Sequence, residues 1–240
     1  MAGLLSIELD AAVALVTLCR PEKRNALSID LRLELADAFA RLGEGEDVRC
    51  AVLTGAGSAF CSGMDTTQFG GDRAHRERLV ESSLAAFNAV ARYPRPLIAA
   101  VNGPAIAGGF VLALYADVRL AESAARFGFP ELPRGIPPSY AAARAALPEP
   151  LARELCLTGR LLDAQEALHH GLVSEICPDG EVVSRALEVA GAIAAQPPGA
   201  VMETKRRILL DAQRQRGALV ADEERVFRAA LLGADPDTAA

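Results

Sequence analysis

Two short stretches of strand-like residues open the chain. Apolar and polar residues alternate along residues 4–10, and β-branched residues recur from there to residue 20, which predicts two strands joined near Asp10. Pro21 is expected to end this pair. Ser28 fits the N-cap of a helix that ends at Gly43, because apolar residues follow it at helical spacing: Leu31, Leu35, Ala38, Phe39 and Leu42. This helix should cover one face of a sheet.

Two nearly continuous apolar runs predict strands that are buried on both faces. They are CAVLT at residues 50–54 and LIAAV at residues 97–101, and each is followed by glycine within two residues. Between them, residues 73–92 form a long amphipathic pattern that predicts a helix. Buried strands that alternate with helices indicate βαβ units in an α/β protein with a mainly parallel sheet.

The second half of the chain is predicted to be mostly helical. Helical segments are expected near residues 140–147, 150–157, 164–169, 181–195, 200–214 and 219–232. Neither an internal repeat nor a Ser/Pro-rich linker marks a domain boundary, so a single domain is predicted. Residues 233–240 lack apolar periodicity, and we expect this tail to be frayed.

Composition narrows the range of functions. The 240 residues are enough for a one-domain α/β protein with a sizeable core. With aromatic residues at 5% and no Trp, that core must consist of Ala, Leu, Val and Ile. The 25 basic and 31 acidic residues are spread along the chain and give a net charge of −6, which argues against nucleic acid as a partner.

The cysteines and the apolar segments indicate a cytoplasmic protein that does not bind a membrane. The five cysteines are odd in number and lack the spacing of a metal site, which is typical of reduced thiols. The chain does not begin with a secretory signal pattern. Its longest apolar stretch, residues 97–116, is interrupted by Asn102, Gly103 and Pro104 and by a glycine pair.

Two glycine-containing loops are the strongest candidates for chemistry. AFCSGMD at residues 59–65 and NGPAIAGGF at residues 102–110 each follow a buried strand and are expected to lead into a helix. The free N–H groups at a helix N-terminus favour negative charge, so the two loops together could hold an oxyanion. Each loop alone is equally compatible with a simple tight turn.

Four motifs in order resemble the crotonase (enoyl-CoA hydratase/isomerase) superfamily. They are RPEKRNAL at 20–27, FCSGMD at 60–65, NGPAIAGG at 102–109, and LTGR at 157–160 followed by Ala164, Glu166 and GLV at 171–173. The similarity covers roughly residues 4–210. It implies a crotonase (ClpP-like) spiral of ββα units over residues 1–195, and a C-terminal helical trimerisation region over 196–240 within the same domain. A homotrimer or a dimer of trimers is therefore expected.

The resemblance also implies the reaction centre. In that family two backbone amides stabilise a thioester enolate of an acyl-CoA, and they correspond here to Met64 and Gly108. Because the contacts come from the main chain, the Met64 side chain can differ from those of its relatives. Gly108 is expected to allow close approach of the substrate. Coenzyme A enters as part of the substrate, and no separate cofactor or metal is implied.

The family's hydratases hold one water between two glutamates, and this chain has only one of them. The first would fall at Val111, which can neither bind water nor transfer a proton; the second is Glu131. A carboxyl group among Phe127, Phe129 and Leu132 should have a pKa raised by desolvation, as a general base at neutral pH requires. A single base that moves a proton between C2 and C4 resembles the arrangement of Δ3,Δ2-enoyl-CoA isomerases.

Further residues within the resemblance are candidates for binding coenzyme A. They are Arg24, Ala26, Ser62, Asp65 and Lys205, of which Lys205 lies in a basic cluster that could meet phosphates. Asp65 is also expected to cap the helix after the first loop. A solvated basic helix face explains Lys205 equally well.

The other chemical candidates have simpler interpretations. The three histidines lack metal-ligand spacing, and Ser62 lacks the GxSxG surroundings of a nucleophile. Ser139 and Tyr140 replace a small glycine-rich stretch of the family; they are expected to line the acyl pocket, although Tyr140 could donate a hydrogen bond. Isomerase is the leading activity, and an enoyl-CoA hydratase or a non-catalytic acyl-CoA binder are the alternatives.

Overall fold

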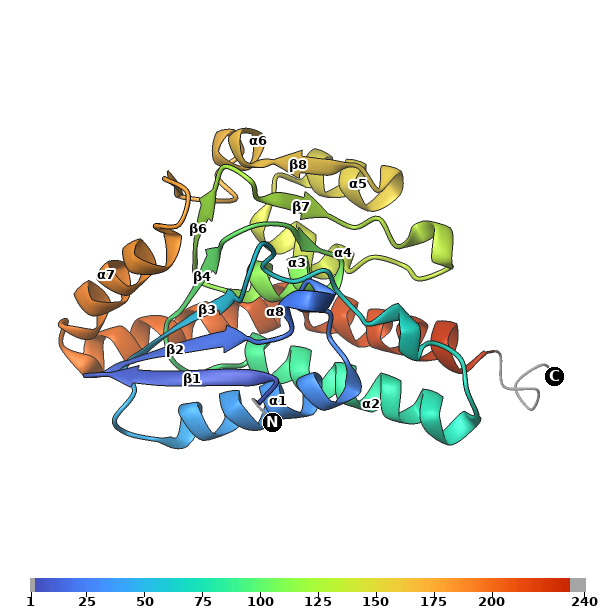
Figure 1. Cartoon of the computed structure of the whole chain (residues 1–240), viewed down its shortest axis with the longest axis horizontal. Coiled ribbons are helices and arrows are strands. Elements are labelled where there is room, and N and C mark those ends of the chain that lie inside the picture. Colours follow the sequence, from blue (N-terminus) through green and yellow to red (C-terminus); the bar gives the residue numbers. More distant parts are fainter. Residues whose placement is uncertain (1–2, 234–240) are drawn as a thin grey trace.

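The computed structural model of the chain describes residues 3–233 and contains one large sheet and one small sheet (Figure 1). The strands of the large sheet lie in the order β1-β2-β3-β4-β6-β9, and all neighbours are parallel except the antiparallel pair β1–β2. They are β1 Leu5–Asp10, β2 Val13–Leu18, β3 Cys50–Gly55, β4 Leu97–Val101, β6 Val118–Glu122 and β9 Glu175–Cys177. The predicted opening pair and the two apolar strands are confirmed.

The small sheet connects the second glycine loop to the C-terminal half. Its strand β5 (Ala105–Ile106) is parallel to β7 (Arg126–Gly128), which is antiparallel to β8 (Leu161–Asp163). These strands have two or three residues each, which is too short for a periodic pattern. The sequence therefore predicted none of them.

Side chains of the central strands alternate between two hydrophobic layers. Cys50 and Val52 of β3 pack with Val182 and Ala186 of helix α7, while Leu53 faces the core beneath the other helices. That core is not purely aliphatic as predicted, because several phenylalanines are also completely buried in it: Phe39, Phe60, Phe110, Phe127 and Phe129.

The helices begin and end close to their predicted positions. Ser28 caps the first helix by accepting the Leu31 N–H, as expected. The α-helices are α1 Ile29–Glu44, α2 Arg73–Ala91, α3 Gly108–Tyr115, α4 Tyr140–Ala146, α5 Glu149–Thr158, α6 Ala164–His169, α7 Val182–Ala194 and α8 Pro198–Leu232; the short 3-10 helices are η1 Pro21–Lys23, η2 Thr66–Gln68 and η3 Leu132–Arg134.

The long helix α8 corrects one prediction. Two helices were expected over 200–214 and 219–232, but the structure has one continuous helix through Gly217. A single glycine costs only about 1 kcal/mol in a helix, and packing against α2 and α4 holds the helix together. Figure 1 shows α8 extending across most of the molecule toward the C-terminus. The predicted frayed tail falls almost entirely on residues 234–240, which lie outside the described residues.

Candidate active site

The two glycine loops lie against each other. A short parallel bridge joins Cys61 to Ala105: the Cys61 N–H donates to the Pro104 carbonyl (3.1 Å), and the Ile106 N–H donates to the Cys61 carbonyl (2.9 Å). The first loop leads only into the three-residue helix η2, not into a regular α-helix as expected. The second loop leads into α3, as predicted.

The Met64 amide is left free by the way the first loop pairs with Leu27. The Leu27 N–H donates to the Gly63 carbonyl (2.8 Å), and the Asp65 N–H donates to the Leu27 carbonyl (3.2 Å). Consecutive N–H groups of an extended segment point to opposite sides, so the Met64 N–H points away from Leu27. Within residues 3–233 it donates no hydrogen bond.

The Gly108 amide is also free, because Gly108 is the first residue of α3. The preceding Ala107 N–H donates to the Gly128 carbonyl (2.9 Å), and the helix ladder starts with the Val111 N–H on the Ala107 carbonyl (3.0 Å). In the described part of the chain the Gly108 N–H has no acceptor. Ala107 adopts φ 51° and ψ −120°, a conformation that favours glycine and costs an alanine about 1–3 kcal/mol.

Glycines allow the loops to pack at backbone distance. A Cβ at Gly63 would lie 3.2 Å from the Gly108 nitrogen, which places the peptide before Met64 beside the Gly108 amide. A Cβ at Gly109 would lie 2.1 Å from the Cys61 carbonyl oxygen. At Gly108 the neighbour of an added Cβ is the Phe87 ring at 2.9 Å, so packing against Phe87 already requires this glycine, apart from any ligand.

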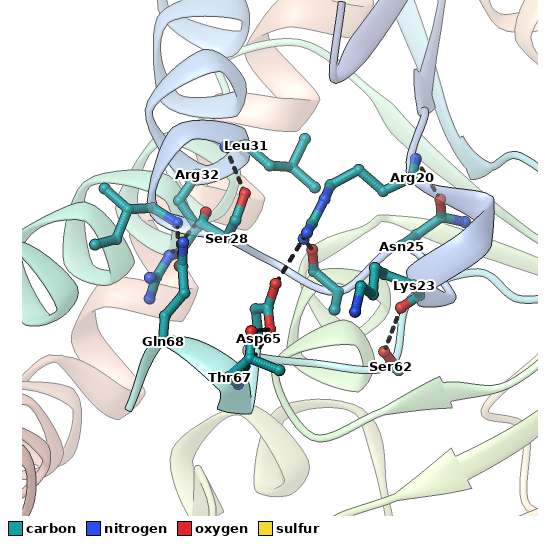
Figure 2. A network of polar contacts seen from close by, with 12 residues as sticks. Arg20, Lys23, Asn25, Ser28, Leu31, Arg32, Ser62, Asp65, Thr67 and Gln68 are labelled. Atoms are coloured by element: carbon teal, nitrogen blue, oxygen red, sulfur yellow. Dashed lines mark hydrogen bonds and ion pairs between the residues drawn. The ribbon is translucent and has the colours of Figure 1, made fainter. Parts of the chain in front are cut away.

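A polar network fixes the first loop to the segment before α1 (Figure 2). Arg20 binds Asp65 through an ion pair of 2.9 Å and also donates to the Ala26 carbonyl. Asp65 caps η2 by accepting the Thr67 N–H (3.2 Å), so the predicted cap is confirmed on a shorter helix. Burial acts to raise the pKa of Asp65, but hydrogen bonds from Thr67 and Arg20 hold it below the ordinary value.

A second set of contacts in Figure 2 holds the same segment from the other side. The buried Asn25 side chain accepts the Arg20 N–H (2.9 Å) and donates to the Ala59 carbonyl (2.8 Å). The Gln68 side chain of η2 accepts the Ile29 N–H at the start of α1 (2.8 Å). The free amide of Met64 therefore sits on a backbone that is fixed at both ends.

Glu131 supplies a carboxyl group with an unusual pKa. It follows β7 and comes two residues after the buried Phe129, whose ring packs against Phe110 with centroids 4.9 Å apart. Burial raises the pKa of Glu131 from 4.5 to about 7, against smaller lowering effects of its own backbone N–H and of Arg134. Its buried Oε2 has no hydrogen-bond partner among the described residues. Such a carboxyl can take up and release a proton near neutral pH.

Both free amides and Glu131 line one cavity of about 1460 Å³. Val111 also lines it and is 7% exposed, so an apolar side chain stands where the family's hydratases have their first glutamate. The Ser139 side chain lies on the wall, as expected, but Tyr140 is not among the lining residues.

The residues expected to bind coenzyme A are only partly brought together. Arg24, Ala26, Ser62 and Asp65 line the cavity, although the Asp65 carboxylate is already engaged by Arg20 and Thr67. Lys205 does not line the cavity.

The position of Lys205 contradicts a phosphate-binding role within this chain. Its side chain is 4% exposed, and its Nζ lies 2.7 Å from a carboxylate oxygen of Asp117. The ammonium group therefore has a buried counter-ion and is not available to a phosphate.

Several polar residues of the cavity were not predicted from the sequence. Among them are Tyr115 at the end of α3, and Arg216 and Glu223 on α8. The spacing of the α8 residues that face the cavity, from Leu209 through Gln213 and Val220 to Phe227, is that of one continuous helical face. That spacing is visible in the sequence once 200–232 is treated as a single helix.

The ββα topology, the paired glycine loops and the long C-terminal helix define a crotonase fold. A family model described as enoyl-CoA hydratase/isomerase matches residues 8–235, and the chain belongs to this family of acyl-CoA enzymes. It is 40% identical over 201 residues to enoyl-CoA hydratase EchA19 of Mycobacterium tuberculosis. The aligned region covers 81% of this chain and 76% of that relative.

Solved structures agree with this assignment. An enoyl-CoA hydratase/isomerase from Mycobacterium paratuberculosis matches with a TM-score of 0.91 and 28% identity, over 98% of this chain and 96% of that one. A monofunctional enoyl-CoA isomerase from M. smegmatis matches with a TM-score of 0.74 and 33% identity, over 88% and 95% of the two chains. The predicted fold and family are confirmed.

Residues 3–233 contain neither a candidate membrane span nor a cluster of metal ligands. None of the helices there is both long enough and apolar enough to span a membrane. The same residues contain no group of three or more His, Cys, Asp or Glu side chains that could hold a metal ion.

Proposed function

We propose that this protein is a Δ3,Δ2-enoyl-CoA isomerase that uses Glu131 as its only base. The observation that carries the proposal is the Glu131 carboxyl, whose pKa is about 7, in a cavity where Val111 stands in place of the second catalytic carboxylate. A base that must both remove and return a proton works best when its pKa is near the working pH.

The reaction would need only groups of this chain. The Glu131 carboxylate removes a proton from C2 of the 3-enoyl thioester, and the electron pair moves to the carbonyl oxygen to give an enolate. The N–H groups of Met64 and Gly108 stabilise that oxygen, each by about 3 kcal/mol. The enolate then collapses while the Glu131 carboxyl protonates C4, which leaves the double bond between C2 and C3.

The coenzyme A part of the substrate is proposed to lie along the 20–27 segment and the first glycine loop. Arg24 is exposed at the cavity, and Ala26 and Ser62 lie beside it. An exposed guanidinium can meet a phosphate without first breaking an internal ion pair. No separate cofactor is needed for the proposed proton transfer.

Hydration is the second candidate, because the relatives at 34–40% identity include proteins named enoyl-CoA hydratase and (E)-benzylidenesuccinyl-CoA hydratase, the latter from Thauera aromatica. A hydratase here would have to orient its water with Glu131 alone. Val111 offers no hydrogen bond to that water, and we therefore rank isomerisation first.

The test offers 3-hexenoyl-CoA and 2-hexenoyl-CoA in parallel to the wild type and to Glu131→Gln. Conjugation of the 3-enoyl substrate without addition of water, lost in the variant, supports isomerisation. In D₂O, a single base that carries the proton should leave part of the product with hydrogen, not deuterium, at C4. Hydration of the 2-enoyl substrate as the faster reaction would overturn the ranking. Binding of both without turnover would indicate a non-catalytic acyl-CoA binder.

We also propose that the chain assembles as a homotrimer or a dimer of trimers. Large apolar side chains are exposed on three consecutive elements: Leu157 on α5 (77% exposed), Leu161 on β8 and Leu168 on α6. We expect them to contribute to a subunit interface, because exposed apolar residues that form a contiguous patch mark such interfaces. Sedimentation equilibrium would test this, and a monomer at micromolar concentration would contradict it.

A further inference from the structure

One face of α3 leads from the Gly108 amide into the depth of the cavity. Gly108, Val111 and Tyr115 all line the cavity, and residues at this spacing share a helix face. At 1.5 Å per residue, the Tyr115 backbone lies about 10 Å along the helix axis from Gly108. If the thioester carbonyl binds at Gly108, as the proposed function requires, Tyr115 stands beside the acyl chain beyond the reacting carbons.

The Tyr115 hydroxyl is not used by the protein. Its ring packs against the core, yet the hydroxyl makes no hydrogen bond within residues 3–233. Burial and the charge of Glu223 raise the pKa of Tyr115 to about 12, so the phenol stays protonated and can both donate and accept a hydrogen bond. Because Tyr115 lines the cavity, its hydroxyl is accessible there, and a substrate oxygen could supply the missing partner.

Arg216 brings a second free donor to the same end of the cavity. It lines the cavity and forms neither an ion pair nor a hydrogen bond with the described residues. It is close enough to Tyr115 to lower that pKa slightly. Its guanidinium therefore remains available to a ligand.

The nearby carboxylates are already occupied. Glu223 accepts hydrogen bonds from the Ser139 hydroxyl (2.8 Å) and the Ala141 N–H (2.7 Å), and Glu224 accepts one from Asn88 (3.0 Å). They add two negative charges beside the single positive charge of Arg216. A substrate carboxylate would be repelled by this surplus, whereas a neutral oxygen would not.

We propose that Tyr115 and Arg216 form a subsite for a neutral oxygen on the acyl chain, so that hydroxyacyl- or ketoacyl-CoA substrates are preferred over plain hydrocarbon chains. Three bonds of an extended chain span about 3.5 Å, and tyrosine side chains lean toward the helix N-terminus. The oxygen should therefore lie about six to eight carbons from the thioester carbonyl.

The first experiment measures binding, so that it does not depend on the isomerase reaction. Calorimetry compares octanoyl-CoA, 8-hydroxyoctanoyl-CoA and the CoA half-thioester of octanedioic acid, with the wild type, Tyr115→Phe and Arg216→Gln. The wild type should bind the hydroxy compound about tenfold more tightly than octanoyl-CoA, as one hydrogen bond to a buried group allows. Both variants should lose most of this preference while retaining the affinity for octanoyl-CoA.

The control is Tyr93→Phe, which removes a buried tyrosine hydroxyl without a partner among the described residues, at a residue that does not line the cavity. It should keep the wild-type preference. The second experiment compares kcat/KM for 3-octenoyl-CoA and 8-hydroxy-3-octenoyl-CoA. If neither is turned over but the binding preference holds, the subsite stands and the isomerase proposal fails. Equal binding of octanoyl-CoA and its hydroxy analogue, or tighter binding of the carboxylate, would overturn the subsite.

Discussion

Replacing Glu131 with glutamine is expected to make the protein more stable at pH 8 and inactive at the same time. The carboxyl is buried, its Oε2 has no partner among residues 3–233, and its pKa is about 7 in place of 4.5. A group whose pKa is raised by folding favours the folded state at low pH, where it is protonated in both states. That contribution is lost as the pH rises from about 4.5 to about 7, because the ionised form is poorly solvated in the fold.

The size of the effect follows from the same two values. A rise from 4.5 to about 7, at about 1.36 kcal/mol for each pH unit, corresponds to roughly 3 kcal/mol at high pH. Glutamine cannot ionise. The free energy of unfolding of Glu131→Gln, relative to that of the wild type, should therefore grow by about 2 to 3 kcal/mol between pH 5 and pH 8. Urea unfolding at four pH values measures this difference. Glu34→Gln, at an exposed position of α1, is the matched control and should show no such change.

The catalytic activity of Glu131→Gln should fall although its stability rises. Loss of a general base lowers the rate by about 10² to 10⁴, and kcat/KM of the wild type should rise about tenfold per pH unit until about pH 7. A variant that is no more stable than the wild type at pH 8, or one that keeps its activity within tenfold, would refute the assignment of Glu131 as a buried base.

Three further substitutions test the ion pairs and the backbone strain at and near the site. Asp65→Asn removes the ion pair with Arg20, so unfolding at pH 7 should require about 2 kcal/mol less; the loss should begin to shrink as the pH falls below the ordinary pKa of 3.8 and should vanish once the pH is below the lowered pKa of Asp65 in the fold. Ala107→Gly relieves the φ of 51° and should raise the free energy of unfolding by about 1 kcal/mol, measured by urea titration. Lys205→Met leaves the Asp117 carboxylate, which is 17% exposed, without its counter-ion and should destabilise the fold by about 2 kcal/mol, while the KM for the acyl-CoA stays unchanged; a raised KM in a folded variant would restore the predicted phosphate contact.

Continuous apolar runs made the centre of the fold predictable. CAVLT and LIAAV gave β3 and β4 to within one residue, because parallel strands covered on both faces consist almost entirely of apolar residues. The strand β6 escaped prediction, since Arg119 and Glu122 interrupt its apolar pattern. Arg119 is tolerated there because its guanidinium donates to carbonyls at the end of α3 and to that of Leu172.

The lining of the cavity was predictable where short motifs mark it. The motifs pointed to Met64, Gly108 and Glu131, and the structure brings these three residues to one cavity. Tyr115 and Arg216 were missed, since they come from helices that are about a hundred residues apart in sequence. No local pattern predicts that the same cavity is lined by α3 and by α8.

The amides of Met64 and Gly108 are free because the residues next to them form the hydrogen bonds of both loops. Leu27 forms hydrogen bonds with both neighbours of Met64: it donates to the Gly63 carbonyl and accepts from the Asp65 N–H. The Met64 amide between them therefore has no partner on that side. At the other loop the strained Ala107 donates to Gly128, which turns the chain so that Gly108 starts a helix with its N–H unpaired. Each donor is thus left free by a contact next to it and not by disorder, and loosening either contact should weaken catalysis before it weakens the fold.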